Sequence, residues 1–140
     1  YIARTDTYIE KEAMINEEGA VEVDKRAFSI EPFVYADGKL ITWHDVESAQ
    51  SLQEGWLPIP TVTWRTRNVT LETTSWMDSS TLWVKYRIGH AAGLQSPTLF
   101  VTLRPFQVNP STQFLNTPGG AASIHSIAMD PDPAPTSHNN

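Results

Sequence analysis

The sequence predicts an all-β protein, an antiparallel β-sandwich, from three observations. Runs in which apolar and polar residues alternate, each about as long as one strand, recur over most of the chain. Turn-forming residues separate these runs at the short spacing that is typical of antiparallel sheets. Thr, Val and Trp, which suit a pleated and half-buried surface, are frequent within them.

The N-terminal part of the chain predicts a hairpin preceded by a less regular segment. Residues 1–25 mix charges with isolated apolar positions, and allow either a short helix near 9–17 or an edge strand. From there the period changes to two in "AFSIEPFVYADGKLITW". Asp37-Gly38 lies between the two apolar runs of this stretch, and both residues accept the positive φ that a two-residue hairpin turn requires.

The central segment 44–60 predicts a helical turn within "HDVESAQSL" and extended chain within "EGWLPIP". The extended part follows from its prolines, because the residue before a proline is disfavoured in the α region.

Further strands are predicted along the rest of the chain. The stretch "TVTWRTRNVTLETTSW" (61–76) has the composition of a strand, and apolar positions alternate in 80–88 and 97–106. A glycine-containing turn at 89–96 separates the last two runs, and residues 121–129 are expected to supply one last strand.

These elements divide the chain into three parts. We expect an N-terminal edge segment over 1–25, a β-sandwich domain over 26–129 and a Pro-rich linker or disordered tail over 130–140. The last part, "DPDPAPTSHNN", lacks an apolar anchor and therefore has no means of packing.

The composition argues against several classes of partner. The net charge of −6 disfavours binding to nucleic acid or to an anionic membrane surface, since both require clustered Lys and Arg. The absence of cysteine precludes a disulfide framework and a thiolate metal site. No apolar run reaches the roughly 18 residues that a membrane helix requires. Without an initiating Met, the sequence is interpreted as part of a longer protein.

The sequence contains no recognisable catalytic or cofactor-binding motif. No histidine pairs with another at a metal-site spacing, and "MDPDP" lacks the turn Gly and the final Glu of a calcium loop. There is no Gly-x-Ser-x-Gly elbow and no Gly-rich phosphate loop, and no facing pair of carboxylates stands out. We therefore expect this chain alone not to be an enzyme, and to hold neither a metal nor a cofactor.

Five tryptophans are many for a chain of 140 residues. Trp can offer a flat apolar face to a sugar ring, although its commonest use is packing. For Trp64, Trp76 and Trp83, which lie in predicted strands, we expect packing in the core or at a domain interface. Trp43 and Trp56 flank an irregular segment, where packing and ligand binding both remain open.

Two stretches, "IEPFVYADGKLITWHDVESAQSLQEGWLPIPTVTW" and "LFVTLRPFQVNPSTQFLNTPGG", resemble part of long bacterial proteins of the coagulation factor 5/8 type, or discoidin-domain, class. The resemblance covers about residues 26–128. In such proteins a galactose-mutarotase-like sandwich precedes an (α/α)6 toroid similar to six-hairpin glycosidases. The resemblance implies a carbohydrate-processing context and an incomplete supersandwich, with the catalytic acids on a helical domain that this sequence does not contain. The location stays open, with a secreted or periplasmic one favoured. The present sequence also contains no recognisable discoidin module.

The connection "LRPFQVNPSTQFLNTPGG" (103–120) is unusually long and rich in amides. Arg104 offers a rigid fork of donors, and each amide pairs a donor with an acceptor, which suits sugar hydroxyls. A loop bonded to its own backbone is an equally open alternative. The sequence therefore predicts carbohydrate contacts by two aromatic and five polar side chains: Trp43, Trp56, Arg104, Gln107, Asn109, Gln113 and Asn116.

Two functions follow from these patterns. The first is a non-catalytic accessory domain of a carbohydrate-active enzyme, packing on the adjacent catalytic domain of the same polypeptide and bordering its cleft. The second is an independent carbohydrate-binding module with exposed Trp and amide side chains. The crowding of apolar residues in 43–64 also predicts self-association of the chain, through this region or through an unpaired strand edge.

Overall fold

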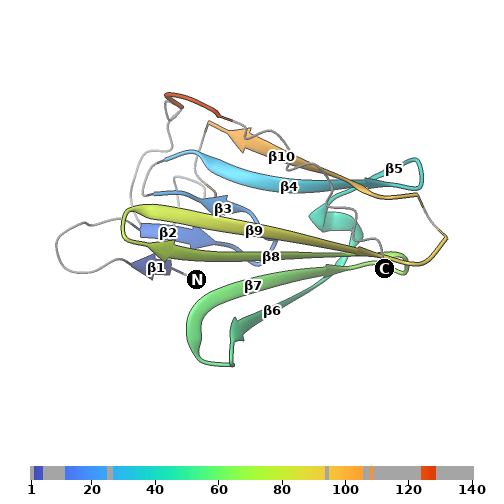
Figure 1. The fold of residues 1–140 in the computed structure, drawn as a ribbon, viewed down its shortest axis with the longest axis horizontal. Coiled ribbons are helices and arrows are strands. Elements are labelled where there is room, and N and C mark those ends of the chain that lie inside the picture. The colour runs from blue at the N-terminus through green and yellow to red at the C-terminus, as the bar shows by residue number, and fades with distance from the viewer. Residues whose placement is uncertain are drawn as a thin grey trace, which may run out of the picture.

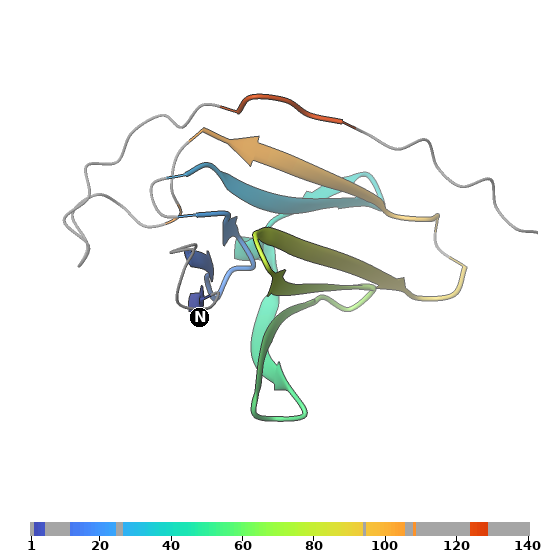
Figure 2. The ribbon, with the colours of Figure 1, turned by 60° about the vertical axis from the view of Figure 1, so that its left-hand side comes forward.

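The chain forms two antiparallel sheets that pack face to face, as the all-β prediction requires (Figure 1). The computed structural model describes residues 2–4, 12–24, 27–93, 95–105, 108 and 124–128. Figure 2 shows β4 (blue) and β10 (orange) in one layer and β8 and β9 (olive) in the other. The predicted antiparallel sandwich is therefore confirmed.

Sheet A has the order β1-β2-β3-β4-β10, with β5 also pairing to β4. Its strands are β1 (Ile2–Arg4), β2 (Glu12–Ile15), β3 (Val21–Glu22), β4 (Ser29–Ala36), β5 (Lys39–Ile41) and β10 (Thr98–Arg104). Sheet B has the order β6-β7-β8-β9. Its strands are β6 (Glu47–Gln53), β7 (Leu57–Arg65), β8 (Val69–Asp78) and β9 (Thr81–His90). A 3-10 turn, η1 (Trp43–Asp45), leads from sheet A to sheet B.

The hairpin predicted at Asp37-Gly38 is confirmed. β4 and β5 pair up to Ala36 and Lys39, and the two residues between them have φ values of 53° and 74°. For the N-terminal segment, the sequence allows a short helix or an edge strand. Its described residues contain the strand β2, which is not at an edge because it pairs with both β1 and β3.

Three sequence-based expectations differ from the structure. The helical turn expected within "HDVESAQSL" is confined to η1, and β6 follows because its backbone pairs with β7. The stretch 61–76 contains two strands joined by a turn in which the Thr66 side chain accepts hydrogen bonds from the N–H groups of Asn68 and Val69. Residues 124–128, part of the expected last strand, belong to neither sheet.

Alternation along the strands fills the space between the sheets. On β8, for example, Val69 and Leu71 are buried and Thr70 between them is exposed. The core cluster draws on both sheets: Ile15, Val21, Val34, Ala36 and Ile41 from sheet A, and Val62, Trp64, Val69 and Leu71 from sheet B. The inward side chains of β9 are only partly buried against it, so the core is thinnest along this strand.

Trp64 ties the two sheets together with a directed bond. Its side chain is 3% exposed, and its Nε1 donates to the carbonyl oxygen of Glu18 at 2.9 Å. Glu18 belongs to the β2–β3 turn, in which Asn16 Oδ1 accepts from the N–H groups of Glu18 and Ala20. Gly19, at a φ of 86°, completes this turn with its Cα facing the indole, since a Cβ there would lie 3.6 Å from Trp64 Nε1.

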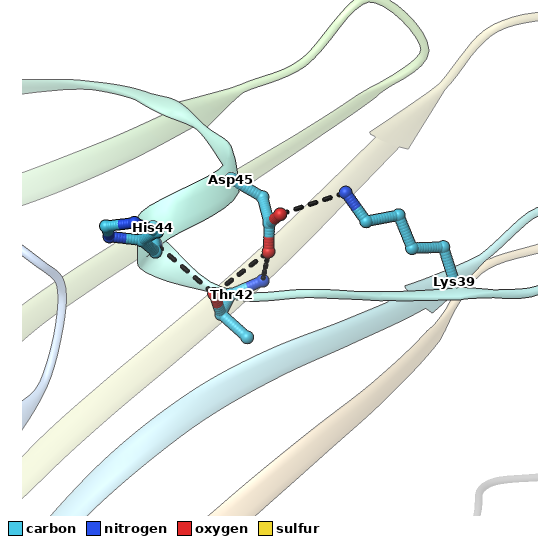
Figure 3. Close-up of polar contacts among 4 residues, drawn as sticks. All are labelled: Lys39, Thr42, His44 and Asp45. Carbon is cyan, nitrogen blue, oxygen red and sulfur yellow. Dashed lines mark hydrogen bonds and ion pairs between the residues drawn. The ribbon is translucent and has the colours of Figure 1, made fainter.

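The crossover between the sheets is fixed by Asp45 (Figure 3). Its carboxylate accepts from Lys39 Nζ at 2.9 Å and from the Thr42 N–H and hydroxyl at 3.1 and 2.9 Å. Thr42 Oγ1 in turn accepts from the His44 N–H, which completes a capping box around η1. The hydrogen bond from Lys39, with those from Thr42, lowers the pKa of Asp45 from 3.8 to about 2.

Tyr86 is an unsatisfied group at the thin side of the core. Its hydroxyl is buried and has no hydrogen-bond partner among the described residues. Burial raises the pKa of this phenol to about 12. The ring therefore contributes packing, while the hydroxyl has lost its hydration without compensation.

We predict that Trp64→Phe lowers the free energy of unfolding by about 1–3 kcal/mol, because it leaves the Glu18 carbonyl without its donor and opens space in the core. Urea denaturation followed by circular dichroism measures the change. Trp56→Phe, the same replacement on an exposed side chain of the β6–β7 turn, is the matched control and should change stability by less than about 0.5 kcal/mol. Equal losses from both variants would contradict the role given to Trp64.

We predict that Lys39→Met raises the pKa of Asp45 toward its ordinary value, because it removes the strongest hydrogen bond to the carboxylate. Since the folded pKa lies below the unfolded value, Asp45 contributes stability above about pH 4 and loses it as the pH falls toward 2. An NMR titration of the Asp45 carboxyl carbon measures the shift. Lys85→Met should leave it unchanged, and an unaltered pKa in Lys39→Met would exclude the bond as its cause.

We predict that Tyr86→Phe keeps or raises the free energy of unfolding, by up to about 1 kcal/mol, because the buried hydroxyl has no partner to lose. Thermal and urea denaturation measure this, with Tyr35→Phe on the exposed face of sheet A as the control. A loss larger than about 1 kcal/mol in Tyr86→Phe would mean that the hydroxyl is hydrogen-bonded after all.

Candidate functional site

The outer face of sheet B is polar and carries an aromatic pair. The pleat directs Leu82, Val84 and Tyr86 of β9 into the sandwich, so the residues between them point outward. On β8 the outward positions alternate with the buried Leu71 and Thr73. The cross-strand register then sets Glu72 beside Arg87, Thr74 beside Lys85 and Trp76 beside Trp83 on this face.

Two prolines make this face concave. The β7–β8 ladder runs from Arg65 only as far as Thr61, whereas the β8–β9 ladder continues to the hairpin turn. Pro58 and Pro60 precede Thr61 and have no N–H to donate to a neighbouring strand. The tips of the β6–β7 and β8–β9 hairpins consequently diverge (Figures 1 and 2).

The fork between the hairpins holds a groove of about 450 Å³. Hydroxyls form its floor, where the Oγ1 atoms of Thr61 and Thr74 are 2.8 Å apart and hydrogen-bonded. The β6–β7 side and the β8–β9 side supply the rest of the lining: Ser51, Gln53 and Ile59 from the first, and Glu72, Trp76, Lys85 and Arg87 from the second.

Trp76 and Trp83 form one aromatic platform at this groove. Their rings are nearly parallel, with centroids 6.3 Å apart and an interplanar angle of 11°. Such a cross-strand pair stabilises the β8–β9 hairpin by about 0.5–1.5 kcal/mol beyond the area it buries. This structural role does not use all of the aromatic surface, since Trp83 remains 51% exposed.

The charges at the groove are loosely held. Arg87 Nη1 lies 3.9 Å from Glu72 Oε2, and the Arg87 side chain is 78% exposed. An ion pair of this length and exposure contributes little to stability, so both groups can exchange it for a ligand. Lys85 lines the groove and makes no ion pair within the described part of the chain.

Acidic side chains are scarce in the lining of the groove. Glu72 is the one carboxylate that lines the groove, whereas glycoside hydrolysis requires a facing pair. Among the described residues no group of three His, Asp or Glu side chains could hold a metal ion.

In the same residues no helix has the length and hydropathy to cross a membrane.

Of the seven side chains that the sequence predicted to contact carbohydrate, the structure describes three, and these three lie far from one another. Trp43 lies on η1, 42% exposed and edge-on to the His44 ring, and Trp56 lies in the β6–β7 turn, 69% exposed. The whole length of β6, roughly 23 Å at 3.3 Å per residue, lies between these two positions. Arg104 ends β10 in the other sheet and is paired with Glu31 at 3.1 Å. The remaining four, Gln107, Asn109, Gln113 and Asn116, lie outside the described residues.

For the three strand tryptophans, the sequence predicts packing in the core or at a domain interface. Trp64 is in the core, whereas Trp83 is 51% exposed, so for Trp83 the domain-interface alternative stays a prediction. The signal for Trp83 was present, because it shares its alternation phase with Lys85 and Arg87 and not with the apolar positions of β9. No sequence pattern indicated that the β6–β7 and β8–β9 hairpins diverge near Pro58 and Pro60, since the divergence depends on how the two hairpins pair with each other.

No protein-family model matches the chain, and neither a curated protein nor a solved structure is significantly similar to it.

Proposed function

We propose that this chain is a non-catalytic β-sandwich module of a carbohydrate-active protein, and that it binds carbohydrate in the groove on the outer face of sheet B. The observation that carries the proposal is the half-exposed Trp83, stacked on Trp76 beside a floor of hydroxyl groups.

Sugars combine an apolar ring face with a dense array of hydroxyls, and the groove offers a partner for each. Trp76 lines the groove, and Trp83, stacked on it beside the groove, extends its flat apolar surface. Thr61 and Thr74 provide hydroxyls that can both donate and accept. The Gln53 amide adds a donor and an acceptor at the opposite wall. A mostly apolar platform with a few convergent polar groups is the usual composition of a ligand site.

The carbohydrate-processing context implied by the resemblance to discoidin-domain proteins agrees with this proposal. In that context the chain would deliver or retain a polysaccharide for a catalytic domain of the same polypeptide, since the groove itself has no facing pair of carboxylates.

A second candidate function, packing on that catalytic domain, is favoured by a different face. The outer face of sheet A exposes Tyr35, Leu40 and Phe100, each between 45% and 50%, on paired strands. A cluster of exposed apolar side chains of this kind suits a protein interface. The two candidate functions use opposite faces of the sandwich and are compatible with each other.

We predict that the purified chain binds at least one polysaccharide and that Trp83→Ala weakens this binding at least about tenfold, because it removes the platform. Affinity electrophoresis in gels that contain single polysaccharides detects the binding, and isothermal titration calorimetry measures it. Trp83 is outside the core, so the variant should remain folded by circular dichroism.

Trp43→Ala and Trp56→Ala are the matched controls, since each removes an exposed Trp that neither lines the groove nor stacks on Trp76. We expect both to bind within about twofold of the unchanged chain. If Trp43→Ala or Trp56→Ala abolishes binding and Trp83→Ala does not, the ligand contacts are those that the sequence alone suggested. Failure of the chain to bind any polysaccharide would contradict the proposed function.

A further inference from the structure

The basic side chains of this acidic protein differ in how closely they are paired with carboxylates. The net charge is −6, and two of the described cations are neutralised by short ion pairs, Lys39 with Asp45 at 2.9 Å and Arg104 with Glu31 at 3.1 Å. Lys85 and Arg87 differ from these two cations. Lys85 makes no ion pair among the described residues, and Arg87 makes only the long contact to Glu72.

These two cations lie in line with the aromatic platform. Trp83, Lys85 and Arg87 alternate outward on β9, so consecutive members are about 7 Å apart at 3.3–3.4 Å per residue. Lys85 and Arg87 both line the groove, where Glu72 is the one opposing carboxylate. The local balance at the groove is therefore positive, opposite in sign to the chain as a whole.

The local charge decides which ligand the groove favours. The field of the whole chain repels anions, but at 0.1 M salt charges beyond about 10 Å are largely screened. By this spacing, a ligand on the Trp83 face lies about 7 Å from the Lys85 position and about 14 Å from the Arg87 position, so Lys85 acts on the stacked sugar and Arg87 acts on the next unit along the groove. Carboxylate and sulfate groups are the partners of such side chains, the guanidinium through a two-pronged bond and the ammonium as a point charge.

We propose that the groove recognises an acidic glycan, of which one sugar ring stacks on the Trp76–Trp83 pair and the anionic groups of successive units bind Lys85 and Arg87. The inference rests on the proposed function, because it names the class of carbohydrate for the same groove. Glu72 then has two uses: it holds Arg87 near the groove in the free protein, and it accepts from a sugar hydroxyl once the anion has taken its place.

The test compares polymers that differ in charge alone. Polygalacturonate and alginate carry carboxylates, dextran sulfate carries sulfates, and the carboxyl-reduced forms of the first two and plain dextran are their neutral counterparts. We expect binding to at least one acidic polymer, about tenfold weaker binding to its neutral counterpart, and further weakening when salt is raised from 50 to 200 mM. Comparison of the uronates with dextran sulfate identifies which anionic group is preferred.

Single variants assign the effect to the groove. Lys85→Gln and Arg87→Gln should each weaken binding to the acidic polymer about tenfold, since each removes a charge-assisted bond. Arg67→Gln makes the same change of charge in the β7–β8 turn, outside the groove lining, and should alter binding less than about twofold.

The outcomes separate this inference from the proposed function. Equal binding to an acidic polymer and to its neutral counterpart, or binding to neutral polysaccharides only, overturns the acidic-glycan inference and leaves carbohydrate binding intact. Equal binding to polyglutamate, or an equal loss in Arg67→Gln, also overturns it, because charge alone would then account for the binding. Failure to bind any polysaccharide, charged or neutral, overturns both.

Discussion

The hydrogen bond from the Trp64 indole to the Glu18 carbonyl, at 2.9 Å, is the directed contact that fixes the registration of the two sheets, and a longer bond of 3.4 Å from Gln50 Nε2 to the Glu17 carbonyl supports it. Apolar packing of Val34, Leu71 and their neighbours supplies most of the stabilisation, at about 1.5–3 kcal/mol for each fully buried large side chain, but it tolerates sliding of one sheet over the other. The hydrogen bond of the indole does not tolerate such sliding, because it joins one atom of a β7 side chain to one atom of the β2–β3 turn. Asn16 and Gly19 are required to present that carbonyl, since they fix the turn and leave room for the ring.

The same strand that anchors the core also opens the groove. β7 carries Trp64 near its end and Pro58 and Pro60 near its start, so one end is fixed in the sandwich and the other is released from β8. Polar floor residues are then accessible from outside, and the apolar Ile59 faces the groove rather than the core. Rigidity and concavity arise within a single strand because its two ends differ in hydrogen-bonding capacity.

The outer faces of the two sheets differ in their surface chemistry. Sheet B turns outward a stacked tryptophan pair, hydroxyls and loosely paired cations, whereas sheet A turns outward an apolar cluster around Tyr35 and Phe100. The first suits a hydrated, hydroxyl-rich ligand, and the second suits the surface of another protein domain. In the proposed function, the apolar face of sheet A would pack on a neighbouring domain while the groove on sheet B stays open to solvent.

The sequence by itself determined the fold class, the Asp37-Gly38 hairpin and the inward phase of most strands, because each of these depends on local alternation and on which residues accept a positive φ. It did not determine β6, whose residues are nearly all exposed and become a strand only through pairing with β7, nor that β9 and β10, consecutive in the chain, belong to different sheets. The phase of Trp83 could be read from its neighbours, but its pairing with Trp76 and the splaying of the hairpins required the register of β7, β8 and β9. Local pattern thus decided what each segment is, and long-range backbone pairing decided which side chains meet at the groove.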